Sequence, residues 1–219
     1  MIRKLLKKIT YPFLKLGTKT YFSKPRLYEY EGVEVMVMPD VFPPHYTIST
    51  KIILDFIKPL NIEHKTVLEL GCGSGIIALY ASSKKAEVTA SDINKTALKM
   101  LSNTSLKNAY ELNIIESNLF DSIKNQGFDY VIINPPYYAK TPKNIKEQAW
   151  FCGENFEYYT ALFSQLVSRN DKTVLMILSE DCDLKTIQSL AAQNNLKFIL
   201  QLEKKVLGEK NYIFKIEAY

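Results

Sequence analysis

The sequence predicts an α/β fold with a mostly parallel, seven-stranded twisted sheet, helices on both faces and a C-terminal antiparallel hairpin. Three observations support this fold class. From residue 65 onward, short apolar runs alternate with stretches of helical spacing. A glycine-rich turn follows the first of these runs and opens a helix. The last two apolar runs are close enough in sequence to form a hairpin.

The length and composition predict one globular domain with a short extension. The chain has 219 residues, of which 47% are hydrophobic and 23% charged, an ordinary globular balance. Its three cysteines are widely spaced and His45 and His64 are its only histidines, so we expect no metal site. Free thiols, no apolar run near 18 residues and no signal-peptide pattern predict a cytoplasmic protein without a transmembrane segment.

The N-terminal segment carries the basic character of the chain. Residues 1–26 hold eight Lys or Arg and no acidic residue, whereas the remainder has 20 basic and 23 acidic residues, a balance of −3. Residues 2–9 have helical spacing of apolar positions. We therefore expect residues 1–45 to form an N-terminal extension, with a basic helix and a strand, and residues 46–219 to form the main domain. The basic arm could contact RNA phosphates, lie on an anionic membrane surface or pack on the body.

The elements follow in order along the chain. Alternation predicts a strand over 33–38, two prolines predict a loop over 40–46, and a helix is expected over about 48–58. The later strands are expected at 66–70, 87–91, 112–116, 128–133, 173–178, about 196–203 and about 211–217. The later helices are expected at 76–83, 95–106, 154–168 and 184–194. Residues 208–211 would join the last two strands.

The glycine-rich turn indicates which ligand the sheet binds. Gly71, Gly73 and Gly75 let the backbone turn sharply and approach a ligand closely. No Lys-Ser/Thr pair follows, and the G-x-G-x-G spacing differs from the dinucleotide fingerprint G-x-G-x-x-G. Glu69 directly before the turn would repel a pyrophosphate. A cofactor with a cationic end, an amino-acid moiety and no phosphate fits better, and S-adenosylmethionine has these features.

An acidic residue ends the next predicted strand. Asp92 lies about 20 residues after the glycines, where a carboxylate accepts hydrogen bonds from ribose hydroxyls. Alternatively, Asp92 or Asn94 caps the helix that begins near Lys95.

The segment Asn134-Pro135-Pro136-Tyr137 directly follows an apolar strand. Two prolines fix φ and remove two backbone donors, so the strand has a rigid exit that projects the Asn134 carboxamide. The Asn134 oxygen and a proline carbonyl can accept the two hydrogens of a flat NH₂ group, while Tyr137 stacks on its plane. We therefore expect residues 134–137 to be catalytic.

These segments resemble the class I methyltransferases that carry an NPPY motif, above all the HemK-like protein-glutamine group and the related small-domain RNA methyltransferases. The resemblance covers about residues 40–180 and implies a Rossmann-like fold that binds S-adenosylmethionine. Residues 118–121 resemble the acidic turn beside the cofactor's adenine, with Asn118 where Asp is usual. The expected cofactor-binding residues are Thr47, Glu69, Gly71, Cys72, Gly73, Gly75, Asp92, Ile93, Asn118, Leu119 and Asn134.

The resemblance implies methylation of a planar nitrogen, which is mainly positioning and electrostatics. We expect the acceptor to be a glutamine amide in a protein; the alternative is adenine N6 or guanine N2 in RNA. We do not expect residues 1–45 to form the full helical N-terminal domain of the release-factor enzyme. An NAD-dependent oxidoreductase is a more distant alternative, against which the glycine spacing and the NPPY motif both argue.

Two further segments have open alternatives. The segment from Val41 to Ser49 could close over the methionine end of the cofactor, or Thr47 could simply cap the following helix. Residues 137–152 form a long connection with three lysines. These lysines could meet nucleic-acid phosphates or form a solvated loop face, and we prefer the solvated face. Cys72 has no base nearby in the sequence, so it is not expected to act as a nucleophile.

Overall fold

The structure is a computed structural model that describes residues 23–39, 41–45 and 47–219. The helix predicted over residues 2–9 lies outside the described residues. Within them, no helix is long and apolar enough to cross a membrane.

A short antiparallel hairpin precedes the main sheet. Strand β1 (Arg26–Tyr30) pairs with β2 (Val33–Val37). Glu31 and Gly32 between them both have positive φ, which suits a two-residue turn between right-twisted strands. The valines of β2 are buried and the residues between them are exposed, as the alternation predicts. Strand β1 is an addition to the predicted elements.

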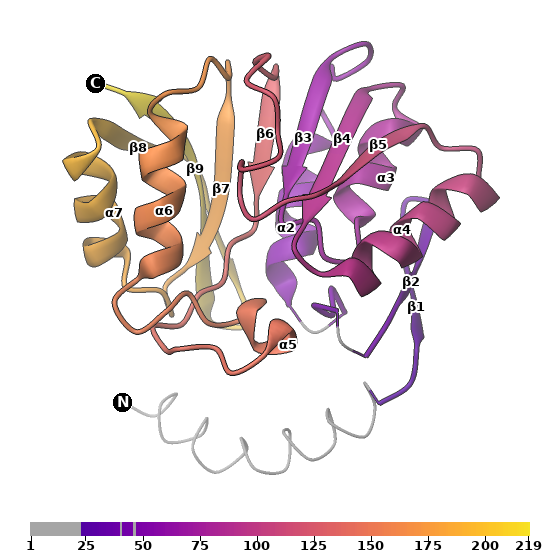
Figure 1. Cartoon of the computed structure of the whole chain (residues 1–219), viewed down its shortest axis with the longest axis horizontal. Coiled ribbons are helices and arrows are strands. Elements are labelled where there is room, and N and C mark those ends of the chain that lie inside the picture. The colour runs from indigo at the N-terminus through magenta and orange to yellow at the C-terminus, as the bar shows by residue number, and fades with distance from the viewer. Residues whose placement is uncertain (1–22, 40, 46) are drawn as a thin grey trace.

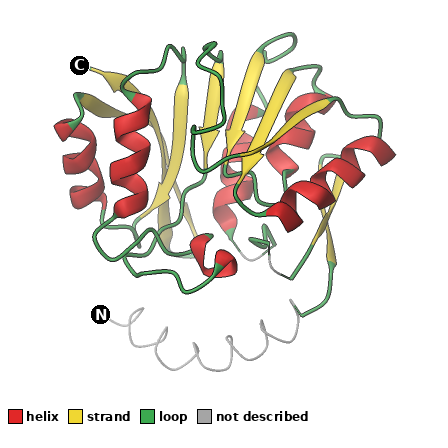
Figure 2. Cartoon of the chain, in the orientation of Figure 1, coloured by secondary structure: helices red, strands yellow, loops and turns green. Residues whose placement is uncertain are grey.

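Seven strands form the main sheet, in the order β5-β4-β3-β6-β7-β9-β8 (Figures 1 and 2). Strands β3 to β7 are parallel, and β9 runs antiparallel to both β7 and β8. This confirms the predicted fold class. The strands are β3 (Thr66–Leu70), β4 (Glu87–Asp92), β5 (Leu112–Glu116), β6 (Tyr130–Ile133), β7 (Val174–Ser179), β8 (Leu196–Val206) and β9 (Glu209–Ala218).

Helices cover both faces of this sheet (Figure 2). One buried cluster combines the β1–β2 hairpin with helices α2, α3 and α4, and a second combines α6 and α7 with the opposite sheet face. Successive residues of β3 divide between them: Val67 belongs to the first cluster and Leu68 to the second. The helices are α2 (Ile48–Ile57), α3 (Ile76–Ser83), α4 (Lys95–Lys107), α5 (Ile145–Gln148), α6 (Glu157–Leu166) and α7 (Leu184–Gln193).

Several predicted boundaries were wrong. Strand β6 begins at Tyr130 instead of 128, because Asp129 uses its carboxylate to accept hydrogen bonds from the backbone and hydroxyl of Thr66. Helix α6 begins at 157 instead of 154. The last hairpin turns at Leu207 and Gly208, not over 208–211, because both residues have the positive φ that a two-residue turn needs. Strands β8 and β9 are therefore longer than expected.

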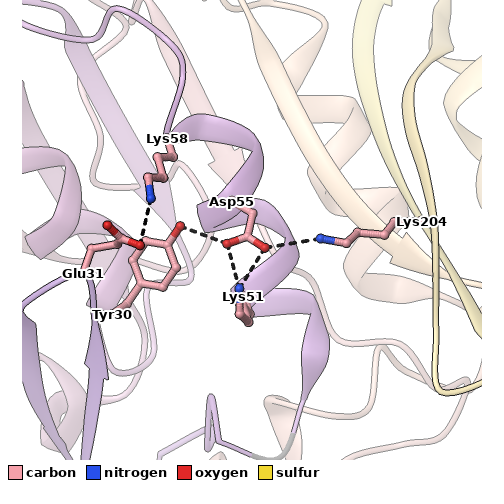
Figure 3. Close-up of polar contacts among 6 residues, drawn as sticks. All are labelled: Tyr30, Glu31, Lys51, Asp55, Lys58 and Lys204. Atoms are coloured by element: carbon pink, nitrogen blue, oxygen red, sulfur yellow. Dashed lines mark hydrogen bonds and ion pairs between the residues drawn. The ribbon is translucent and has the colours of Figure 1, made fainter.

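A cluster of polar side chains links helix α2 to strands β1 and β8 (Figure 3). Asp55 accepts hydrogen bonds from Tyr30 of β1 at 3.0 Å and from Lys204 of β8 at 3.3 Å. Burial raises the pKa of Asp55, but these bonds and those from Lys51 outweigh it and hold the pKa below its usual value. The position of α2 is thus tied to the hairpin and to the sheet edge. The cluster consists of Tyr30, Glu31, Lys51, Asp55, Lys58 and Lys204.

Strand register brings three predicted site segments together. Leu70 of β3 pairs with Ser91 of β4 on one side and with Ile133 of β6 on the other. The residues that follow these three, Gly71, Asp92 and Asn134, therefore lie at the same edge of the sheet, with Asp92 as the last residue of β4. The strand order reverses between β3 and β6, and such a switch point is where open α/β sheets bind ligands.

Candidate active site

A cavity of about 660 Å³ lies at the carboxyl edge of β3, β4 and β6. Ten of the predicted site residues line it: Glu69, Gly71, Cys72, Gly73, Asp92, Ile93, Asn118, Leu119, Asn134 and Pro136. Four others do not line it: Thr47, Gly75, Pro135 and Tyr137.

The glycine turn forms the floor of the cavity beside β3. Gly71, Gly73 and Gly75 all have positive φ, a conformation that favours glycine. A Cβ on Gly71 would meet no atom within 4 Å, so this backbone faces open space. Gly75 is different, because a Cβ there would overlap Leu101 of α4. Gly71 and Gly73 thus border the ligand space, whereas Gly75 starts α3 and lets it pack closely on α4.

Asp92 is held toward the cavity by backbone amides. Its Oδ2 accepts from Gly73 N at 2.7 Å and its Oδ1 from Asn94 N at 2.8 Å. Asn94, not Asp92, caps α4, since its side chain accepts from the backbone amides of Thr96 and Ala97. Burial raises the pKa of Asp92. Each carboxylate oxygen keeps lone pairs for further donors such as ribose hydroxyls.

Glu69 is a second buried carboxyl in the same cavity, and it is only 5% exposed. Its Oε2 accepts from Ala78 N at 2.7 Å, which satisfies an amide in the first turn of α3. Burial raises the pKa of Glu69 to about 8, and the negative charge of Asp92 adds to the rise. This pair of acidic groups makes the cavity favourable for a cation.

Asn118 and Leu119 form another wall, after β5. Leu119 has a positive φ of 50°, and its carbonyl accepts from the Ser117 hydroxyl at 2.8 Å. The Asn118 amide donates to Asp121 Oδ2 at 3.4 Å, so the Asn118 side chain is anchored through its nitrogen. Its amide oxygen is the end that could accept a hydrogen bond.

The NPPY segment extends β6 into the cavity edge. The Tyr137 hydroxyl donates to Asn134 Oδ1 at 3.3 Å, and the Asn134 amide faces Ser49 and Thr50 of α2. The carbonyl of Pro136 accepts from the buried Tyr159 hydroxyl at 3.0 Å. Tyr137 therefore lies against Asn134 and packs on the second core cluster, outside the cavity wall. Its stacking on an acceptor stays a prediction.

Thr47 stands at the N-cap of α2 but makes no capping hydrogen bond. Its hydroxyl is buried and has no partner among the described residues. Thr47 therefore occupies the N-cap position without a side-chain capping bond, and its role toward the cofactor stays a prediction. The neighbouring residues Val41, Phe42 and Thr50 line the cavity instead. For Cys72, burial raises the thiol pKa well above its usual value, which disfavours a thiolate nucleophile.

Sequence reasoning missed the wall formed by residues 141–161. Its helix α5 lies beside the carboxyl ends of the strands (Figure 1). Lys140, Lys143 and Lys146 are exposed on this connection, and Lys140 Nζ lies 4.6 Å from the Phe151 ring centroid. The length of the connection was the available signal. Lining residues from this wall are Thr141, Pro142, Ile145, Gln148, Ala149, Phe151, Cys152, Gly153, Glu157, Tyr158 and Ala161.

These residues fit S-adenosylmethionine. The open space in front of Gly71 admits a ligand against bare backbone. Asp92 offers a carboxylate for ribose hydroxyls, and Glu69 suits a cationic methionine end. Ile93 and Leu119 supply apolar surface for a flat base. Among the described residues, no group of three or more His, Cys, Asp or Glu side chains is arranged to hold a metal ion.

Comparisons with known proteins agree with this geometry. Residues 33–152 match the model of the methyltransferase small domain family. A Methanocaldococcus jannaschii protein provisionally named as an N5-glutamine methyltransferase is 31% identical over 110 residues, which are 50% of this chain and 53% of that protein. The chain thus spans about half the length of this relative.

Two solved structures share the fold. The Mtq2–Trm112 complex of E. cuniculi, described as responsible for methylation of the termination factor eRF1, gives a TM-score of 0.61 at 22% identity, over 82% of this chain and 99% of that one. The T. thermophilus 16S rRNA N2 G1207 methyltransferase, solved with AdoMet and guanosine, gives a TM-score of 0.60 at 16% identity, over 87% of this chain and 50% of that one. The family match extends over more than half of the chain and takes in the glycine turn, Asp92 and the NPPY segment, so the chain belongs to the methyltransferase small domain family, whose cofactor is S-adenosylmethionine.

Proposed function

We propose that this protein transfers a methyl group from S-adenosylmethionine to the side-chain amide nitrogen of a glutamine in a protein. The observation that carries the proposal is the position of Asn134. Its carboxamide lies on the wall of the cavity that contains the glycine turn and Asp92. An amide that accepts hydrogen bonds beside the cofactor site is suited to hold a flat NH₂ group.

The residues of the chain would act mainly by orientation. Asn134 Oδ1 and the carbonyl of Pro135 would each accept one hydrogen of the acceptor NH₂ group. We assign the second bond to the Pro135 carbonyl, although Pro136 is the proline that lines the cavity, because Tyr159 already takes one lone pair of the Pro136 carbonyl. These two bonds would polarise the nitrogen, oppose delocalisation of its lone pair and direct that lone pair toward the methyl group.

The cofactor supplies a methyl group that is already electrophilic because it is bound to a sulfonium. The acceptor nitrogen forms the new N–C bond while the electron pair of the C–S bond passes to sulfur. The nitrogen then releases one proton to water, since it becomes strongly acidic once methylated. No basic side chain is required for this step.

The choice of glutamine rests on the NPPY motif and on the relatives. One relative is provisionally named as an N5-glutamine methyltransferase, and a structure of similar extent belongs to a complex that methylates eRF1. A base in RNA is the competing acceptor, because another structural neighbour is an rRNA N2-guanine methyltransferase. The basic segment 1–26 would then contact phosphates.

Transfer of label from methyl-labelled S-adenosylmethionine tests the proposal. The protein is incubated with a lysate that lacks it, and the product is divided between protease and RNase treatment. We expect label that protease removes and RNase leaves, with N5-methylglutamine after enzymatic digestion. Asn134→Ala should lower transfer by about 10²-fold or more, in line with loss of one preorganised polar group in a catalytic site.

Each contrary outcome has a distinct meaning. Label removed by RNase would replace glutamine with an RNA base as acceptor. Label in neither fraction, with cofactor binding intact, would contradict a macromolecular acceptor. Failure to bind S-adenosylmethionine would contradict methyl transfer itself.

A further inference from the structure

Three hydroxyl groups surround the carboxamide of Asn134. Its Nδ2 faces Ser49 Oγ at 3.3 Å and Thr50 Oγ1 at 3.5 Å, while its Oδ1 accepts from the Tyr137 hydroxyl at 3.3 Å. Ser49 and Thr50 belong to the first turn of α2, which is more than 80 residues away in sequence. The carboxamide is therefore held on both ends by other elements of the chain.

The hydroxyls of Ser49 and Thr50 need an explanation, because both residues are buried. Ser49 is 2% exposed and Thr50 is 4% exposed, in a helix whose other buried positions are Ile or Leu. Burying a hydroxyl is costly unless it is hydrogen-bonded. Neither hydroxyl serves as a helix cap, since the N-cap position belongs to Thr47. Both hydroxyls face the amide nitrogen of Asn134, and Ser49 also shares a side-chain hydrogen bond with Tyr137.

The orientation of this carboxamide matters for the proposed function. An amide has one accepting end and one donating end of nearly the same shape. If the group were turned over, its NH₂ would face the NH₂ of the acceptor, and donor would meet donor. With the two amide hydrogens directed at Ser49 and Thr50, the oxygen is the end left to accept a hydrogen of the acceptor NH₂ group. Tyr137 occupies one lone pair of that oxygen and leaves the other available.

We propose that Ser49 and Thr50 are positioning residues that accept the two amide hydrogens of Asn134 and so fix its oxygen toward the methyl acceptor. The effect of this orientation on methyl transfer rests on the proposed function, whereas the orientation of the Asn134 carboxamide is a property of the folded protein alone. Helix α2 is in turn linked to β1 and β8 through the hydrogen bonds of Asp55, so the residues that hold the carboxamide belong to a helix with contacts to two other elements (Figure 3).

The orientation can be measured without any acceptor. The protein is labelled with ¹⁵N-asparagine, and the side-chain signals of Asn134 are identified by their loss in Asn134→Asp. We expect two well-separated amide proton signals in the unaltered protein, with slow exchange with water. In Ser49→Ala/Thr50→Val the two signals should converge and exchange should quicken by about tenfold, because both acceptors of the amide hydrogens are lost.

Matched variants separate positioning from general damage to the fold. Ser105→Ala and Thr89→Val also remove buried hydroxyls, at positions that are 6% and 5% exposed. Ser105 bonds within α4 and Thr89 accepts from Asn113 of β5. We expect these two variants to leave the Asn134 signals unchanged. Thr50→Ser keeps the hydroxyl and should keep the slow exchange even if Thr50→Val fails to fold. Unchanged signals in the folded double variant would overturn the proposal.

Methyl transfer supplies the second measurement. The double variant should lower kcat by about 10- to 100-fold, a larger effect than on the KM for S-adenosylmethionine, although Thr50 also lines the cavity. In an Asn134→Ala background the same pair of substitutions should cause no further loss, since residues that act through one group are not additive. Additive losses would overturn the positioning role. Absence of transfer with normal Asn134 signals would instead contradict the proposed function.

Discussion

At the scale of single residues, two buried carboxyl groups determine the electrostatics of the site. Glu69 and Asp92 line one cavity, and burial raises the pKa of both. Burial shifts the protonation equilibrium of such groups toward the neutral form. A cation placed beside them opposes this shift, so cofactor binding and proton release should be coupled.

Glu69 makes this coupling measurable. Its pKa of about 8 means that the carboxyl is largely protonated at pH 6 and ionised above pH 8. A cationic ligand favours the ionised form, so the affinity for S-adenosylmethionine should rise between pH 6 and about 8 and then level off. Glu69→Gln should bind with an affinity nearly independent of pH over this range. Isothermal titration calorimetry in buffers of different ionisation enthalpy also reports the released proton.

The same raised pKa of Glu69 predicts that the stability of the fold falls as the pH rises, whereas the affinity for the cofactor rises. A folded-state pKa above the ordinary value of 4.5 means that the stabilising contribution is fully present below pH 4.5 and lost as the pH rises through about 8. The free energy of unfolding should therefore fall with pH more steeply for the unaltered protein than for Glu69→Gln. Glu87→Gln, at an exposed position, is the control. Parallel pH profiles for Glu69→Gln and the unaltered protein would contradict the raised pKa.

At the scale of elements, the glycine turn has two separable tasks. Gly71 borders the ligand space, whereas Gly75 begins α3 against Leu101 of α4. Both residues have positive φ, which costs a non-glycine residue about 1–2 kcal/mol. At Gly75 a Cβ would also lie 2.5 Å from Leu101 Cδ1, and overpacking of this kind costs about 1–3 kcal/mol more.

Alanine substitutions test this division. Gly75→Ala should lower the free energy of unfolding more than Gly71→Ala, by the additional cost of the clash with Leu101. Gly71→Ala should instead show the larger loss of affinity for S-adenosylmethionine, because its methyl group enters the open space of the cavity. Urea denaturation and calorimetric titration of both variants provide the comparison. The reverse ranking in either measurement would show that the roles are exchanged.

Sequence patterns located most elements because local signals and packing agree there. The five parallel strands are short apolar runs bounded by turns, and α4 has a capping asparagine at its start. Strand β1 was missed because its residues alternate only weakly, with a burial pattern set by pairing to β2. Helix α5 is a four-residue element inside a connection, which periodicity cannot detect.

Some residues of the site could likewise be predicted from the sequence and others could not. Residues at the carboxyl ends of strands could be predicted, because register alone places Gly71, Asp92 and Asn134 at one edge. The contacts of Asn134 with Ser49 and Thr50 could not, since they join segments 84 and 85 residues apart whose approach depends on how α2 packs on the sheet. The wall at 141–161 was likewise beyond pattern reasoning, because loop geometry lacks a sequence period.

At the scale of the whole molecule, the sheet order turns three strand ends into one binding site. The strand order reverses between the neighbouring strands β3 and β6. The glycine turn after β3 and the NPPY segment after β6 therefore lie on the two sides of the switch point. The same topology could also serve an NAD-dependent oxidoreductase, and the distinction lies in the acids and glycines of this edge. Glu69 and the G-x-G-x-G spacing should reject a pyrophosphate and accept a sulfonium cofactor.

Ligand-dependent stability tests that distinction on the intact chain. A ligand that binds only the folded state at a concentration 100 times its Kd adds about 2.7 kcal/mol of stability. For a chain of this length, that corresponds to a rise in Tm of roughly 5–10 °C. S-adenosylmethionine and S-adenosylhomocysteine should each give a rise of this order, and NADH none. Asp92→Ala should abolish most of the rise, because ribose contacts are lost while α4 keeps its own cap at Asn94. Stabilisation by NADH alone would mean that the carboxyl edge of this sheet selects a dinucleotide despite Glu69, and the family assignment would then describe the ancestry of the chain but not its ligand.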